Sequence, residues 1–324
     1  CTDPENPCSF DYVFSPTFII EDYTEIRFDP SPKTPYTRKL INLTSLVRLN
    51  GNGLTLENSF RIEYNIYERN VGRNQKINFG IVGFTFDQYW ESVLTAKIND
   101  ISFSEDSTMD FEIRDCSFTN LTTNAINISI GPHVDGCHCS SDFSSNQFMA
   151  INLYNTIVAK SRMFIQRDLL GCFVRVANSQ IAYPVGVTIY NGTFYNNSVI
   201  GFNPNIDIIG GGTVGILNST VTSVIGSTFL FNTVNASDST VFGACVYLQN
   251  APCQTSSHVS LKDNVFSGNT LNVFAPLGNL TGAGAGVFMT SQGQTVVTNN
   301  TFSDNLLMGV TRAYGIDIAF DDAA

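Results

Sequence analysis

The chain has 324 residues, a formal net charge of −11 and only 14% charged residues, against about 25% in an average soluble domain. Between Val176 and Ala324 the basic residues are Lys262 and Arg312 alone, so this half lacks the clustered positive charge that binds nucleic acid or an anionic membrane surface. No apolar run approaches the roughly 18 residues of a membrane-spanning helix. We therefore expect no nucleic-acid partner and no membrane span.

Residues 1–50 are predicted to form an irregular N-terminal cap. Six of the eleven prolines lie before residue 36, and each proline removes a backbone donor that a regular sheet needs. A solenoid needs such a cap, because its first coil otherwise exposes unpaired strand edges and an open core. Residues 51–110 follow with strand-like runs at 60–67 and 77–84, and we expect irregular coils there.

Residues 111–324 carry a repeat of about 36 residues. Four Phe-x-x-Asn tetrapeptides begin at Phe194, Phe229, Phe266 and Phe302, spaced 35, 37 and 36 residues apart. Positions seven and five residues before each Phe tend to be apolar or β-branched, as at Val187 and Ile189. A fixed period of this length indicates a solenoid, in which each repeat buries its apolar face only by stacking on the next. The sequence thus predicts an all-β, right-handed parallel β-helix over residues 51–324, with three short strands per coil.

Two fainter copies precede the four clear ones. Phe118 has its Asn one place early, at Asn120, and Val158 stands in the Phe position 36 residues before Phe194. A second strand of each coil is rich in Gly and Ala, at residues 171–176, 212–217, 243–248, 284–289 and 314–318. We expect the Phe rings to stack in the core, and the Asn side chains to bond the backbone and the equivalent Asn of neighbouring coils.

The Phe-x-x-Asn tetrapeptides, alternating with Gly-Ala-x-Val-type strands, resemble the paired repeats of the polymorphic outer-membrane protein family. The resemblance covers about residues 187–320 and, more faintly, 111–186. This chain departs from the family in having single Gly or Gly-x-Gly where Gly-Gly-Ala is expected. The resemblance implies a right-handed parallel β-helix in a surface-exposed, adhesive protein, although a shared fold does not by itself assign a biochemical role.

The eight cysteines are Cys1, Cys8, Cys116, Cys137, Cys139, Cys172, Cys245 and Cys253. An even number in an acidic chain rich in Asn and Thr predicts disulfides formed in an oxidising compartment. The expected bonds join Cys1 to Cys8, Cys245 to Cys253, and Cys137 and Cys139 to Cys116 and Cys172. Two alternatives remain: a lipoprotein anchor at Cys1, and a metal site in residues 133–139, whose ligand spacing does not match a structural zinc site.

Nine Asn-x-Ser/Thr sequons agree with an extracellular location. They begin at Asn42, Asn120, Asn127, Asn191, Asn196, Asn218, Asn235, Asn279 and Asn299. A sequon accepts an N-linked glycan only on a chain that passes through a secretory compartment. The cysteines and the sequons together predict a secreted or cell-surface glycoprotein.

Some enzymes that act on polysaccharides also have a parallel β-helix fold, so a polysaccharide-active enzyme is the main alternative to a structural protein. Such an enzyme would use a pair of carboxylates. An inverting glycosidase needs two carboxylates roughly 6.5–9.5 Å apart. The candidates lie before the regular coils, at Asp100, Glu105, Asp106, Asp110 and Asp115. A third hypothesis is a carbohydrate-binding module in which exposed tyrosines such as Tyr190 and Tyr195 stack on sugars.

The interpretation favoured by the sequence is a non-enzymatic structural or adhesive glycoprotein. It acts as a rigid β-helical spacer or as a subunit of an extracellular assembly or filament, with no cofactor, no metal and no catalytic residue. Its expected partners are copies of itself or other extracellular proteins, together with its N-linked glycans.

Overall fold

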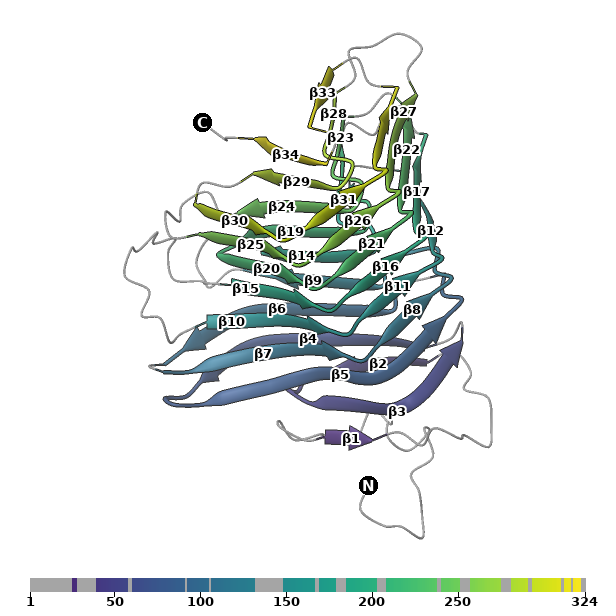
Figure 1. The fold of residues 1–324 in the computed structure, drawn as a ribbon. Helices are drawn as coiled ribbons and strands as arrows, with labels where there is room; N and C mark the ends of the chain where they lie inside the picture. The colour runs from purple at the N-terminus through teal and green to yellow at the C-terminus, as the bar shows by residue number, and fades with distance from the viewer. Residues whose placement is uncertain are drawn as a thin grey trace.

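The computed structural model describes residues 25–27, 39–57, 60–90, 92–104, 106–131, 148–166, 169–178, 185–202, 208–237, 240–250, 257–274, 281–290, 293–309, 312–315 and 317–321. Within these ranges every regular element is a β-strand, and strands of successive coils pair in parallel. The coils stack as a solenoid, with the N-terminal coils at the bottom of Figure 1 and the C-terminal coils at the top. The predicted all-β fold of stacked parallel coils is confirmed.

Sheet A is the largest of four sheets and has fifteen strands. Its first half holds β7 (Thr108–Arg114), β10 (Phe148–Tyr154), β15 (Val185–Tyr190), β20 (Val221–Ile225), β25 (His258–Lys262) and β30 (Gln294–Thr298). Its second half holds β8 (Ser117–Thr119), β11 (Ile157–Ala159), β16 (Thr193–Tyr195), β21 (Thr228–Leu230), β26 (Val265–Ser267) and β31 (Thr301–Ser303). The remaining strands are β1 (Glu25–Arg27), β3 (Arg48–Glu57) and β5 (Lys76–Asp87), of which β5 pairs with both halves.

Three further sheets complete the coils. Sheet B contains β2 (Lys39–Leu43), β4 (Phe60–Val71), β6 (Leu94–Phe103), β9 (Ile126–Ile130), β14 (Val174–Asn178), β19 (Val214–Ser219), β24 (Val246–Asn250), β29 (Val287–Thr290) and β34 (Ile318–Asp321). Sheet C contains β12 (Arg162–Phe164), β17 (Ser198–Gly201), β22 (Thr233–Ser237), β27 (Thr270–Phe274) and β32 (Leu306–Met308). Sheet D contains β13 (Leu169–Leu170), β18 (Ile208–Gly210), β23 (Thr240–Phe242), β28 (Thr281–Ala283) and β33 (Arg312–Tyr314).

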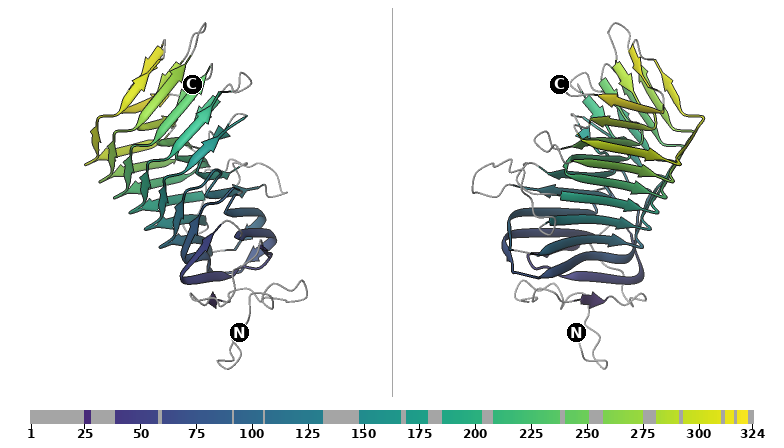
Figure 2. Two further views of the ribbon diagram at one scale, coloured as in Figure 1. Left: turned by 90° about the vertical axis from the view of Figure 1, so that its right-hand side faces the viewer. Right: turned by 60° about the vertical axis from the view of Figure 1, so that its left-hand side comes forward.

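The N-terminal coils differ from the later ones in strand length. Strands β3 to β6 have 10 to 12 residues each, and Figure 2 shows the correspondingly wide coils at the N-terminal end. Strand β2 already belongs to sheet B, and the first residues of β3 belong to sheet A. Both sheets therefore begin inside the predicted cap of residues 1–50. Residues 1–24 and 28–38 of that cap lie outside the described ranges.

A coil such as residues 185–219 contains five strands rather than the three predicted, because residues with positive φ bend the chain at fixed places. Sheet A bends between its halves at Asp115, Asn155, Asn191, Gly226, Asp263 and Asn299. A second bend follows sheet A at Asn120, Lys160, Asn196, Phe231, Gly268 and Asp304. Asn, Asp and Gly are the residues that adopt this left-handed conformation most readily. A third bend, before sheet B, has a positive-φ glycine in the coils from residue 148 onward, at Gly171, Gly211, Gly243, Gly284 and Gly315. At Gly211 an added Cβ would collide with the carbonyl oxygen of Val214.

The predicted column of stacked Phe rings fills the core. Ring centroids lie 4.6 Å apart for Phe194–Phe229, 4.7 Å for Phe229–Phe266 and 4.9 Å for Phe266–Phe302, with planes within 9° of parallel. Val158 pairs in register with both Phe118 and Phe194, so it occupies the Phe position as predicted. Phe86 stacks on Phe118 at 5.1 Å, which extends the column into residues 51–110, where sequence inspection missed a copy.

The Asn of each Phe-x-x-Asn forms a buried ladder that joins the coils, also as predicted. The Nδ2 group donates to the Oδ1 atom of the next Asn at 3.0 Å for Asn197–Asn232, 3.1 Å for Asn232–Asn269 and 3.0 Å for Asn269–Asn305. The same Nδ2 groups donate to backbone carbonyls of the preceding coil, for example from Asn232 to Phe194. A second ladder joins Ser227, Asn264 and Asn300 two residues before each Phe. Both ladders satisfy polar groups that would otherwise be buried without partners.

Candidate functional surface on sheet A

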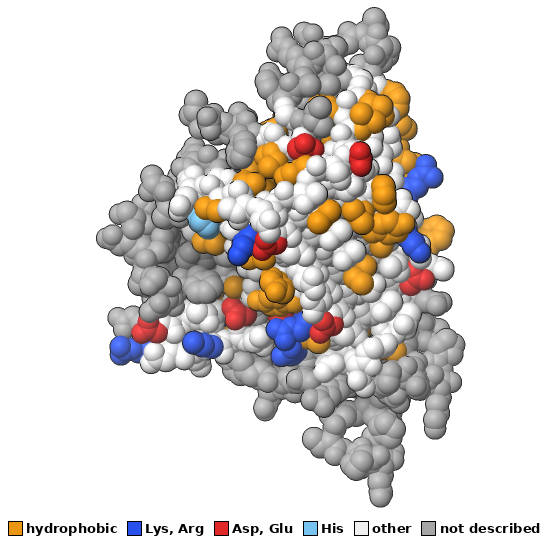
Figure 3. Space-filling model, viewed as in Figure 1, with side chains coloured by type: hydrophobic (Ala, Val, Ile, Leu, Met, Phe, Trp, Pro, Cys, Tyr) orange, Lys and Arg blue, Asp and Glu red, His pale blue; other side chains and the backbone are white. Residues whose placement is uncertain are grey.

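The outer face of sheet A is the surface from which side chains of many coils project in register. In Figure 3 most of this face is white, the colour of backbone and of uncharged polar side chains, with hydrophobic groups in places and few charged groups. Three groups of side chains interrupt this pattern: an ion-pair cluster on β7, a column of tyrosines beside the bend of the sheet, and an aromatic patch around Phe231.

The ion-pair cluster centres on Glu112, which is 3% exposed although it faces outward from β7. Its carboxylate forms ion pairs with Arg48 at 3.2 Å and with Arg114, and it accepts a hydrogen bond from Asn78 at 3.3 Å. The two guanidinium groups compensate the charge of a carboxylate that is removed from water. This arrangement holds Glu112 fixed and covered, as expected of a structural ion pair.

Asp110 is the only predicted catalytic carboxylate that lies beside another acid among those described. It projects from the same face of β7 as Glu112, two residues away, as strand geometry requires. Partial burial, and secondarily the charge of Glu112, raise the pKa of Asp110 above its ordinary value, while Lys76 lowers it. Sequence inspection missed Glu112, although its two-residue spacing from Asp110 was a usable signal.

Of the other predicted carboxylates, those that the structure describes, Asp100, Asp106 and Asp115, are not gathered around Asp110. Asp115 lies at the bend after β7 and accepts a hydrogen bond from Asn155 at 2.8 Å. Asp106 is exposed in the turn before β7, Asp100 lies in β6 of sheet B, and Glu105 lies outside the described residues.

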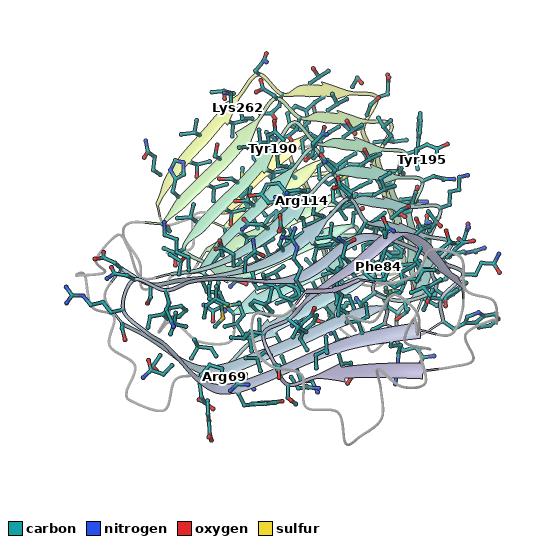
Figure 4. The ribbon with its side chains drawn as sticks, turned by 90° about the horizontal axis from the view of Figure 1, so that it is seen from below. Arg69, Phe84, Arg114, Tyr190, Tyr195 and Lys262 are labelled. Carbon is teal, nitrogen blue, oxygen red and sulfur yellow. The ribbon has the colours of Figure 1, made fainter. Side chains whose placement is uncertain are left out.

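The tyrosine column runs along the solenoid beside the bend of sheet A. Arg114, Tyr154, Tyr190, Ile225, Lys262 and Thr298 are paired in register at the last position of successive strands. The Arg114 guanidinium lies over the Tyr154 ring at 5.1 Å, and Tyr154 meets Tyr190 edge to face at 6.3 Å. Arg114, Tyr190 and Lys262 are labelled in Figure 4. Both cations have an acidic neighbour, Glu112 for Arg114 and Asp263 for Lys262 at 3.8 Å, so the column carries little net charge.

The aromatic patch lies at the second bend and consists of Tyr195, Leu230 and Phe231. Tyr195 meets Phe231 edge to face at 6.2 Å. The Phe231 ring covers Gly268 of the next coil, where a side chain would collide with it. Phe231 has φ 54° and is 54% exposed, an uncommon combination for a bulky residue. The predicted sugar-stacking residues Tyr190 and Tyr195 therefore both lie on this face, each with a second aromatic ring against it.

The described sequon residues occupy two kinds of site. Asn120, Asn191, Asn196 and Asn299 are exposed at the bends of sheet A, with φ between 53° and 55°. Asn127 in β9, Asn235 in β22 and Asn218 in β19 are half-buried. Asn42 lies in β2, and Asn279 lies outside the described residues.

The described cysteines correct the prediction that all eight form disulfides. Cys116, Cys172 and Cys245 are free thiols at most 1% exposed. Each faces the core at a bend: Cys116 occupies the ladder position two residues before Phe118, and its thiol donates to the Arg114 carbonyl at 3.2 Å. Burial raises the pKa of Cys116 and of Cys172 to about 12, and it raises the pKa of Cys245 well above its ordinary value. Their predicted partners Cys137, Cys139 and Cys253 lie outside the described residues, as do Cys1 and Cys8.

Residues 133–139, the alternative metal site, also lie outside the described ranges. Within those ranges no three His, Cys, Asp or Glu side chains are grouped as metal ligands. In the same part of the chain, no helix is long and apolar enough to span a bilayer.

Comparison with known proteins gives no relative from which a function can be transferred. No protein-family model, no curated protein and no solved structure matches the chain. The resemblance to the polymorphic outer-membrane protein repeats therefore remains a prediction from the Phe-x-x-Asn and Gly-Ala-x-Val patterns.

Proposed function

We propose that this protein is a non-enzymatic structural glycoprotein of the cell surface or extracellular space, a rigid spacer or a subunit of an extracellular assembly. The observation that carries the proposal is the continuity of the interior. A single apolar cluster extends from Leu43 in β2 to Met289 in β29. Such a core keeps successive coils from moving independently and suits a chain that must hold a fixed length.

The hydrogen-bond ladders support the same role. Every coil from Ser161 to Asn305 is joined to the next by buried amide or hydroxyl groups. Separating two coils would exchange these hydrogen bonds for hydrogen bonds to water, at a net cost of about 0.5–1.5 kcal/mol for each one. A filament subunit or an adhesin stalk needs this resistance to separation along its axis.

Glycosylation of the sequons is tested by directing the chain through the secretory pathway of cultured eukaryotic cells. The intact mass of the secreted protein is measured before and after enzymatic removal of N-glycans. We expect the mass to fall by several glycans, because four sequon residues are exposed at bends. A secreted chain of unchanged mass would overturn the glycoprotein proposal.

A polysaccharide-active enzyme is the second candidate, and the raised pKa of Asp110 is the observation that favours it. A carboxyl whose pKa is raised is better suited to act as a general acid than an ordinary aspartate, although the neighbouring Glu112 is covered and ion-paired. The test is release of reducing ends or unsaturated products from neutral and acidic polysaccharides. Turnover that is lost in Asp110→Asn and kept in the exposed control Asp106→Asn would establish the enzyme and refute the non-enzymatic role.

A further inference from the structure

The four exposed sequons at the bends of sheet A form a matched set. Asn120, Asn191, Asn196 and Asn299 share an exposed side chain and a φ within 2° of one another. They differ in the residue that precedes them. A tyrosine on the outer face precedes Asn191 and Asn196, whereas a threonine precedes Asn120 and Asn299.

Three members of this set, Asn120, Asn191 and Asn299, have amide groups that are oriented by hydrogen bonds. The Nδ2 atom of Asn191 donates to Asn155 at 3.0 Å, and that of Asn299 donates to Asp263 at 2.5 Å. An amide nitrogen has two hydrogens. In N-glycosylation the bond from sugar C1 to the pyrophosphate of the lipid-linked donor breaks, a bond from C1 to Nδ2 forms, and Nδ2 loses one proton. One hydrogen remains on Nδ2, which is the number that the contact to Asn155 or to Asp263 requires.

Each of the two tyrosines is positioned by a second aromatic ring. Tyr190 is 49% exposed and lies against Tyr154, and Tyr195 lies against Phe231. A ring that is already immobilised loses less conformational entropy when a ligand covers it. The apolar face of a sugar that is attached to the adjacent asparagine has this ring within immediate reach.

We propose that the N-linked glycans of Asn191 and Asn196 pack on Tyr190 and Tyr195, so that the chain's own sugars cover the aromatic surface of sheet A. The inference rests on the proposed function, since it requires a glycosylated chain. We infer that the chain's own glycan covers each tyrosine ring, because the asparagine that carries the glycan is the next residue in sequence and lies on the same outer face. The near-neutral column also matches an uncharged core sugar better than an acidic polymer, which a chain of net charge −11 repels.

A double-mutant cycle on the secreted glycoprotein tests this packing. Thr193→Ala removes the sequon while it leaves Asn191 and its hydrogen bond in place, and Tyr190→Ala removes the ring. The matched control is the same cycle at the bend of the last coil, with Thr301→Ala for the Asn299 sequon and Thr298→Ala for the preceding residue. The readout is the unfolding equilibrium constant from denaturant titration, with glycopeptide mass spectrometry to confirm occupancy.

We expect Tyr190→Ala to raise the unfolding constant about three- to tenfold more in the glycosylated protein than in the Thr193→Ala background. The control cycle at residues 298 and 299 should show no such difference. Equal effects of Tyr190→Ala in both backgrounds, or an unoccupied Asn191 in a chain glycosylated elsewhere, would overturn the inference and leave the proposed function standing. A chain without glycan at any of the nine sequons would overturn both. Binding of added neutral oligosaccharides to the fully glycosylated protein through Tyr190 would show that the ring is free, and would also overturn the inference.

Discussion

Single residues in the ladders carry much of the coupling between coils. Asn232 is 1% exposed, accepts two hydrogen bonds from Asn197, and donates to Asn269 and to the Phe194 carbonyl. We expect Asn232→Ala to destabilise the protein by about 3–5 kcal/mol, because several buried groups lose partners at about 1–3 kcal/mol each. Denaturant titration measures this change.

Asn235 supplies the amide control for that prediction. It lies on the same strand-rich segment but is half-exposed, and its contact with Asn272 is long at 3.4 Å. Because Asn235 begins a sequon, the comparison uses protein expressed without N-glycans, in which Asn235→Ala should change the free energy of unfolding by less than about 0.5 kcal/mol. Equal losses for Asn232→Ala and Asn235→Ala would show that the ladder contributes nothing specific.

Phe231 is the residue whose backbone conformation fits its side chain least well. A left-handed conformation costs roughly 1–2 kcal/mol for a residue with a bulky Cβ substituent, and the equivalent bend residues Asn196 and Gly268 avoid most of that cost. The change Phe231→Asn also creates an Asn-Asn-Thr sequon, so it is measured in protein expressed without N-glycans. There we expect Phe231→Asn to stabilise the protein by up to about 1 kcal/mol, after loss of the ring contact with Tyr195. Phe231→Leu, which keeps the strain and loses the ring, should destabilise it. A loss of stability in Phe231→Asn would contradict this account.

Asp110 gives the clearest expected pH dependence. Its pKa is raised in the folded state, so the folded protein binds the proton more tightly than the unfolded chain does. Ionisation of Asp110 therefore costs more in the folded protein than in the unfolded chain and lowers the free energy of unfolding. This loss of stability is absent below the unfolded-state pKa and develops as pH rises from there through the folded-state pKa. Asp110→Asn should therefore stabilise the protein at neutral pH, with the gain disappearing in acid. Thermal unfolding of both proteins from pH 3 to pH 7 measures the difference, and a gain that is independent of pH would refute it.

At the scale of strands and coils, the sequence predicted which residues stack between coils better than it predicted how many strands each coil contains. The 36-residue period placed the Phe and Asn columns correctly, because side chains that stack between coils repeat with the coil. The number of strands per coil was wrong, since single residues at positive φ, such as Asn191 and Asn196, divide what otherwise looks like one strand. Phe86 was missed because only 32 residues separate it from Phe118 and no Asn follows it at the usual place.

The candidate surface was predictable only in part. Tyr190 and Tyr195 were identified as exposed aromatics from sequence, but their aromatic partners Tyr154 and Phe231 come from neighbouring coils. Disulfides were predicted from the even number of cysteines and from the expected oxidising compartment. Neither observation tells whether a thiol faces the core. Cys116 occupies the place of Ser227 and Asn264 in the second ladder, and recognising that required the register.

Two positions in the Phe column should differ in how much they contribute to stability. Phe229 is fully buried between two rings, whereas Phe302 in the last described coil is only partly buried. We expect Phe229→Ala to cost about 3–5 kcal/mol, the usual loss for a buried Phe, and Phe302→Ala to cost clearly less. Denaturant midpoints of the two variants test the order, and a larger loss at Phe302 would indicate that the last coil is covered in solution.

For the whole molecule the open question is whether the solenoid unfolds as one unit or coil by coil. Repeat proteins follow nearest-neighbour energetics, and strong interfaces between repeats make their unfolding cooperative. Here one apolar cluster contains Cys116, Cys172 and Cys245, which lie in three different coils. We expect all three thiols to resist alkylation in the native protein, because each is buried and has a raised pKa, and thiolate is the reactive form.

Labelling with iodoacetamide at increasing denaturant, read by peptide mass spectrometry, reports on each coil separately. With a shared core and continuous ladders, the three sites should become reactive at the same denaturant concentration as the global transition. Labelling of Cys245 well before Cys116 would instead show that the C-terminal coils detach first. Asn232→Ala then provides the sharper comparison. It interrupts the ladder within the coil that contains Cys245, so it should advance labelling of Cys245 ahead of Cys116 if that ladder is what makes the coils unfold together.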